Sequence, residues 1–110
     1  MGDRRMAEIK TEDGSLYVYS HWGGHGMPKD AKAAVLSAKG RWDDESYATR
    51  IIVDQLTKEC RDMETGAGLM LKPEAEDSYN DDSPSVIIDL PQKVLSVVGT
   101  GQGTWQFKEL

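Results

Sequence analysis

The chain has 110 residues and a formal net charge of −6, with 38% hydrophobic and 29% charged residues. This composition is too apolar for a disordered chain and too polar for a membrane protein, so we expect one soluble domain with one core. Phosphate-rich partners are bound largely through clustered Lys and Arg. The negative charge therefore argues against a general nucleic-acid binder and against binding to an anionic membrane, whereas a basic partner remains compatible with it.

A single cysteine, Cys60, excludes an intramolecular disulfide and gives no sign of an oxidising compartment. The first residues, MGDRRM, lack the apolar stretch of a signal peptide. No apolar run reaches the roughly 18 residues needed to cross a membrane. We therefore expect a cytoplasmic protein without a membrane segment.

The N-terminal part of the chain predicts a β-hairpin. Residues 1–6 are expected to be a flexible lead-in to a single domain over residues 7–110. Apolar and polar residues alternate over 7–11, and a run rich in aromatic and β-branched residues follows over 16–22. The Asp-Gly pair at 13–14 between these runs is a common tight-turn sequence.

Two helices are expected after the hairpin. Pro28 suits the first turn of the first helix, and Gly40 is expected to end it. Asp43 or Asp44 is expected to cap the second helix, and the short link between the two predicts a helical hairpin. The apolar stripe predicted for the second helix contains Tyr47, Ala48, Ile51, Ile52, Leu56 and Cys60.

The remaining chain predicts three or four strands, over 69–72, 86–90, 94–98 and 105–107. The last three strands are expected to form a meander. The predicted fold class is α+β, with a mostly antiparallel sheet and two helices packed on one face. The glycine-rich stretch 99–103 is similar to a phosphate-binding loop, but a strand follows it where such a loop needs a helix, so we expect a hairpin turn.

Residues 19–26 hold the densest group of reactive side chains, with two imidazoles and an indole among three glycines. One interpretation is a ligand-binding site shared with the helix junction, where a guanidinium and an indole suit a phosphate or a base. The candidate ligand-binding residues are His21, Trp22, His25, Arg41 and Trp42. The other interpretation, slightly favoured, is a glycine-rich corner that the fold requires.

The same residues give little support to catalysis or to metal binding. Ser20 and His21 are neighbours on a strand, so their side chains point to opposite faces and do not form a dyad. His21 and His25 lack further ligands at a recognised spacing, so no metal and no cofactor are expected. Cys60 is expected to be a buried, unreactive thiol.

Two charged segments allow alternatives. The basic residues Lys29, Lys32, Lys39, Arg41 and Arg50 form either a solvated helix surface or an anion site. The acidic residues of 74–84 form either a solvated loop or a mimic of a phosphate backbone, and they lack the spacing of an EF-hand calcium site.

Residues 16–56 resemble small uncharacterised proteins of bacteriophage and prophage genomes. The resemblance rests on a Tyr-x-His-Trp-Gly turn before the first helix and an Arg-Trp-x-Asp-x-x-Tyr junction before the second. It implies an accessory protein of the host bacterial cytoplasm that binds a host or phage protein as an inhibitor or interaction module, and that is compatible with a homo-oligomer. The alternative is a protein that binds a small anionic molecule or nucleotide, a hydrolase among the choices, with its site at the glycine- and histidine-rich turn.

Overall fold

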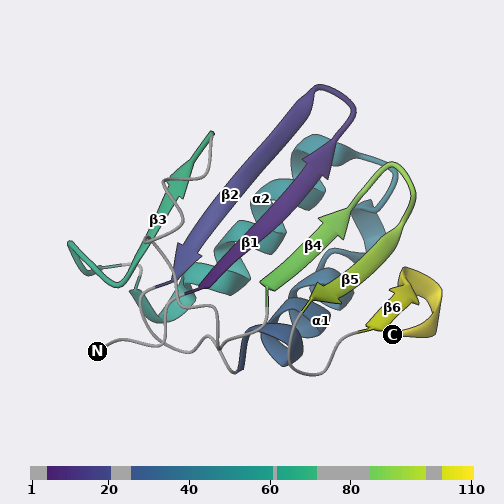
Figure 1. Cartoon of the computed structure of the whole chain (residues 1–110). Coiled ribbons are helices and arrows are strands. Elements are labelled where there is room, and N and C mark those ends of the chain that lie inside the picture. Colours follow the sequence, from purple (N-terminus) through teal and green to yellow (C-terminus); the bar gives the residue numbers. More distant parts are fainter. Residues whose placement is uncertain (1–4, 21–25, 61, 72–84, 99–102) are drawn as a thin grey trace.

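The computed structural model describes residues 5–20, 26–60, 62–71, 85–98 and 103–110, which form a six-stranded sheet and two α-helices (Figure 1). The strands are β1 (Arg5–Thr11), β2 (Gly14–Ser20), β3 (Ala67–Met70), β4 (Ser85–Asp89), β5 (Val94–Val98) and β6 (Gly103–Gln106). The helices are α1 (Met27–Ser37) and α2 (Glu45–Thr57), with short 3-10 turns η2 (Lys39–Arg41), η3 (Lys58–Cys60) and η5 (Phe107–Glu109). The predicted α+β class is confirmed.

The strands follow the order β3-β2-β1-β4-β5-β6 across the sheet. All neighbours are antiparallel except the central pair, β1 and β4, which run parallel and align Ala7 with Val86 and Ile9 with Ile88. The predicted C-terminal meander is confirmed as β4, β5 and β6. The sheet is therefore a hairpin and a meander joined side by side, with β3 and β6 at its edges.

The predicted N-terminal hairpin is confirmed, and its turn lies at residues 12–13. Gly14 has a φ of 137°, which only glycine adopts without strain. The hydroxyl of Thr11 donates to the carbonyl of Gly14 and accepts from the amide of Asp13. β1 begins at Arg5, so the strand extends into the predicted lead-in over residues 1–6.

α1 begins after Gly26, with a proline in its first turn as expected. The prediction that Gly40 ends this helix is wrong. The helix is capped at Ala38, whose amide contacts the carbonyls of Ala34 and Val35, and Gly40 lies within η2 without a positive φ. The chain therefore tightens into a 3-10 turn rather than leaving the helix through a left-handed glycine.

α2 is capped by Asp44, whose side chain accepts a hydrogen bond from the amide of Tyr47. The predicted stripe is confirmed at Ala48 and Ile52, which are fully buried. It is wrong at Tyr47, which is 52% exposed, and the expected burial of Cys60 is wrong too, because that thiol belongs to the half-buried end of η3. The other two members of the stripe, Ile51 and Leu56, are partly buried and pack against the core.

The core lies between the sheet and the two helices, which cover one face (Figure 1). α1 packs against β4 and β1, and α2 packs against β2. The buried face of α1 is made of Ala31, Ala34, Val35 and Ala38. Small side chains let a helix approach a sheet closely. No helix among the described residues is long and apolar enough to cross a membrane.

Candidate functional site

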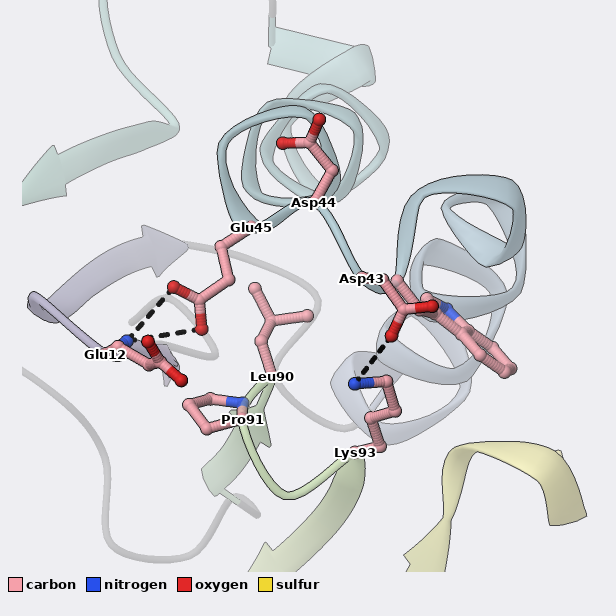
Figure 2. A pocket seen from close by; sticks show the side chains of 8 residues that line it. Glu12, Asp43, Asp44, Glu45, Leu90, Pro91 and Lys93 are labelled. Atoms are coloured by element: carbon pink, nitrogen blue, oxygen red, sulfur yellow. Dashed lines mark hydrogen bonds and ion pairs between the residues drawn. The ribbon is translucent and has the colours of Figure 1, made fainter.

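A cleft of about 370 Å³ opens at one end of the sheet, where three connections meet (Figure 2). The β1–β2 turn, the junction between α1 and α2, and the β4–β5 turn each supply part of its wall. Its lining residues are Glu12, Trp42, Asp43, Asp44, Glu45, Leu90, Pro91 and Lys93. We call this feature the acidic cleft.

Glu45 connects the β1–β2 turn to α2. Both oxygens of its carboxylate accept from the backbone amide of Glu12, at 3.1 and 3.2 Å, as the dashed lines in Figure 2 show. A carboxylate at this position also interacts favourably with the positive N-terminal end of the α2 dipole. The side chain of Glu12 is exposed beside this contact.

Lys93 forms the opposite wall of the acidic cleft. Its ammonium lies 3.0 Å from the carboxylate of Asp43, whose side chain is 93% exposed (Figure 2). Lys93 has a φ of 55°, a conformation that few residues other than glycine adopt. The turn is held there because the Lys93 carbonyl accepts from the amide of Phe107 and the Asp89 carboxylate accepts from the amide of Gln92.

The acidic cleft carries four carboxylates against one ammonium. Several carboxylates that line one cleft attract a cationic side chain more strongly than an isolated surface carboxylate does, because their fields add. In the part of the chain that the structure describes, no three His, Cys, Asp or Glu side chains are grouped to hold a metal ion. The arrangement suits a cationic group of a partner.

A second hollow of about 400 Å³ lies on the other side of Lys93. It is lined by Trp42, Gln92, Lys93, Val94, Gln106, Phe107 and Lys108. Two lysines and two amides surround an aromatic wall, and no carboxylate is among these lining residues. We call this feature the lysine hollow, and its charge is opposite to that of the acidic cleft.

Trp42 stands between the acidic cleft and the lysine hollow and lines both. Its indole N–H donates to the carbonyl of Val35 at 2.8 Å, and its ring packs on Phe107 with the centroids 5.1 Å apart. The side chain is partly buried against the core. Trp42 therefore connects the helix junction to the C-terminal turn η5 and is part of the wall of both cavities.

The candidate residues predicted at the glycine- and histidine-rich turn are described only in part. His21, Trp22 and His25 lie outside the described residues, so their role stays a prediction. The residues that flank them, Ser20 and Gly26, precede α1, whereas Arg41 and Trp42 follow it.

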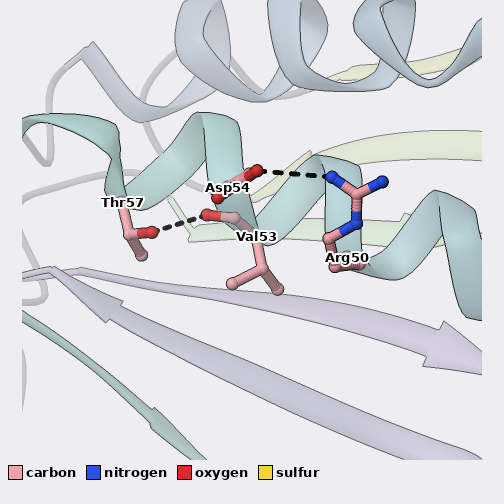
Figure 3. Close-up of polar contacts among 4 residues, drawn as sticks. All are labelled: Arg50, Val53, Asp54 and Thr57. Atoms are coloured by element: carbon pink, nitrogen blue, oxygen red, sulfur yellow. Dashed lines mark hydrogen bonds and ion pairs between the residues drawn. The ribbon is translucent and has the colours of Figure 1, made fainter. Parts of the chain in front are cut away.

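The basic residues expected near this site make contacts within the chain. The guanidinium of Arg41 lies 5.2 Å from the ring centre of Tyr47, and the ammonium of Lys32 lies 4.1 Å from that of Trp105. Arg50 pairs with Asp54, one helical turn away, at 3.4 Å (Figure 3). These contacts spread the basic residues over the helix surfaces and favour the solvated-surface interpretation over a single anion site.

Figure 3 shows the part of α2 that carries the Arg50–Asp54 pair. Beside the Arg50–Asp54 pair, the hydroxyl of Thr57 donates to the carbonyl of Val53 at 2.8 Å, a local contact within the helix. The Val53 side chain points toward the strands.

Sequence reasoning missed the residues that form most of the acidic cleft and the lysine hollow. Glu12, Glu45, Lys93 and Lys108 come from separate connections and share no motif. The signal in the sequence was the position of acidic residues in the connections between elements. The β1–β2 turn and the helix junction both carry consecutive acidic residues, and the parallel pairing of β1 with β4 brings the β4–β5 turn to the same end of the sheet.

Comparison of the chain with protein-family models, with curated proteins and with solved structures finds no match.

Proposed function

We propose that this protein is a non-enzymatic binding module, which engages a basic segment of a host or phage protein through the acidic cleft. The observation that carries the proposal is that four carboxylates, one from the β1–β2 turn and three from the start of α2, line one cleft that holds a single lysine. The resemblance of residues 16–56 to small phage proteins supports an accessory role in the bacterial cytoplasm. An inhibitor or adaptor of this kind needs a recognition surface and no reaction centre.

The geometry supports binding because two of the four carboxylates are held in place before a partner arrives. Glu45 is fixed by the amide of Glu12, and Asp44 is fixed by its capping bond to α2. Preorganised charges lose little conformational entropy on binding, so more of their attraction is available as affinity. The Asp43 side chain is 93% exposed and can exchange its ammonium partner from Lys93 to an incoming cation.

A fluorescently labelled hexalysine peptide tests this function. Its binding is followed by fluorescence anisotropy at low and at high salt, with the wild type compared with the double variant Glu12→Lys, Asp43→Lys. We expect the variant to bind about tenfold more weakly, because each reversal replaces an attraction by a repulsion. Added salt should weaken wild-type binding, since exposed charges are screened.

The matched control is the double variant Glu59→Lys, Asp62→Lys, which changes the net charge by the same amount. Both control residues are exposed and lie outside the acidic cleft. If attraction came from the overall charge of −6 alone, the two double variants would weaken binding equally. Equal weakening, or no hexalysine binding by the wild type at low salt, would contradict the proposed site.

The lysine hollow favours a second candidate function, the binding of a small anionic molecule such as a nucleotide. Lys93 and Lys108 supply positive charge, Gln92 and Gln106 supply amide groups, and Trp42 supplies an aromatic wall. A volume of about 400 Å³ is within the range of ligand pockets. This placement shares only Trp42 with the site predicted from the sequence.

A thermal-shift measurement with a panel of mononucleotides tests the second candidate. A nucleotide at 100 times its dissociation constant stabilises a protein by about 2.7 kcal/mol. We expect Lys108→Ala to abolish the shift and Lys58→Ala, in η3 outside the hollow, to leave it intact. The absence of a shift with every nucleotide, or a shift that survives Lys108→Ala, would remove this candidate.

A further inference from the structure

β3 is the outermost strand at one edge of the sheet. Among the described residues it pairs with β2 alone, with Leu69 opposite Val18 and Met70 opposite Tyr17. In an antiparallel pair, alternate residues of an edge strand turn their N–H and C=O groups away from the neighbour. The outer side of β3 therefore offers backbone groups that a further strand can pair with.

Apolar side chains surround this edge. Leu69 is 53% exposed, Leu71 is 79% exposed, and Met63, in the segment that leads to β3, is 53% exposed. The stretch from Gly66 to Leu71 carries no charged residue. Edge strands of soluble proteins are usually blunted by charges or prolines, so an uncharged edge lined by leucines is characteristic of a pairing surface.

The opposite edge of the sheet differs. β6 is followed directly by η5, whose first residue, Phe107, is buried in the core. Trp105 on β6 is covered on one side by the ammonium of Lys32. The apolar side chains of this edge are thus covered within the chain, whereas Leu69 and Leu71 at the β3 edge are more than half exposed.

We propose that β3 pairs with β3 of a second copy of this chain, which joins the two sheets into one. An antiparallel pairing centred on Leu69 sets Leu69 opposite the same residue of the other copy, and Ala67 opposite Leu71. Side chains at alternate positions share a face, so these leucines form one apolar cluster across the junction. The pairing satisfies the outward backbone groups of both strands.

The lack of charge along this edge favours a second copy of the chain over a basic peptide as the partner. A basic strand would find no carboxylate between Gly66 and Leu71, and its charges would lose water without a partner. The same uncharged strand from a second copy brings no charge into the contact. Its apolar residues match those it meets, although each chain carries a net charge of −6 elsewhere. Self-association at β3 is independent of the acidic cleft, whose residues lie at other connections.

Sedimentation equilibrium of the full chain over a range of concentrations tests the proposal. We expect a reversible monomer–dimer equilibrium in the wild type. Leu69→Lys should weaken it about a hundredfold, because each dimer loses two buried leucines. The control Val98→Lys changes a side chain of the same exposure, 53%, on β5, and should dimerise like the wild type.

Leu71→Lys provides a second variant, which should fold even if a lysine within β3 disturbs the strand, because Leu71 follows the end of β3 and is 79% exposed. It should also weaken dimerisation, while its far-UV circular dichroism stays that of the wild type. Higher salt should preserve the dimer, in contrast to the screening expected for hexalysine binding. A wild type that stays monomeric, or a dimer that survives both leucine variants, would overturn the proposal.

Discussion

Replacing Trp42 by phenylalanine tests whether this residue holds the helix junction to the core. The substitution removes the hydrogen bond from the indole to the carbonyl of Val35, which is worth about 1 kcal/mol. That carbonyl keeps a second donor, the amide of Ala38, so it is not left unpaired. The smaller ring also reduces packing against Phe107, for about 1 kcal/mol more.

The expected total is a loss of about 2 kcal/mol in the free energy of unfolding, or about 8 °C in Tm for a chain of this size. Urea unfolding followed by circular dichroism measures it. Trp105→Phe is the control, because Trp105 is also partly buried and meets Lys32 through its ring face, which phenylalanine retains. A Trp42→Phe variant no less stable than Trp105→Phe would refute the anchoring role.

Three further predictions concern stability and titration. Burial, together with the charge and hydrogen bond of Glu8, raises the pKa of Tyr17. The folded chain therefore holds the phenol proton more tightly than the unfolded chain does. The resulting stabilisation is present below pH 10 and is lost as the pH rises through the pKa of the folded chain. Glu8→Gln should lower that pKa in an ultraviolet phenol titration, and an unchanged titration would contradict the assigned cause. Gly103→Ala should lower the free energy of unfolding by about 1 kcal/mol or more, because the added Cβ would lie 2.7 Å from an indole carbon of Trp105. In the control Gly68→Ala the added Cβ meets nothing within 4 Å, so this variant should be about 0.5 kcal/mol more stable in urea unfolding. Asp44→Ala should lower the free energy of unfolding by about 0.5 kcal/mol through loss of the α2 cap. The effect is small because the capping hydrogen bond is 3.4 Å long. Thermal unfolding followed by circular dichroism measures it, and an unchanged Tm would show that the cap does not stabilise the helix.

The elements of this fold could be predicted because their signals are local. The turn at Gly14, the proline at the start of α1 and the cap of α2 each act over a few residues. The first two are found where the sequence places them, and Asp44 is the cap of the two candidates, Asp43 and Asp44. The end of α1 could not be predicted from Gly40. Hydrogen bonds at Ala38 tighten the chain one turn earlier.

The acidic cleft could not be predicted because it depends on contacts between distant residues. Glu12 and Glu45 are 33 positions apart, and only the packing of α2 beside the first hairpin brings them together. The parallel pairing of β1 with β4, which carries Lys93 to the same end, has no local sequence signal. The sequence predicts Trp42 as a ligand-binding residue from the chemistry of its indole. The structure shows that Trp42 also bonds to Val35 and packs on Phe107.

The most direct test of the proposed binding function is an NMR titration of the isotope-labelled chain with hexalysine. The proposal predicts that the amide shifts that change most belong to Glu12, to Asp43–Glu45 and to Lys93, because these residues surround the acidic cleft. The double variant Glu12→Lys, Asp43→Lys should lose these changes at the same peptide concentration. Shift changes spread evenly over all exposed carboxylates, or centred on another part of the chain, would contradict the account.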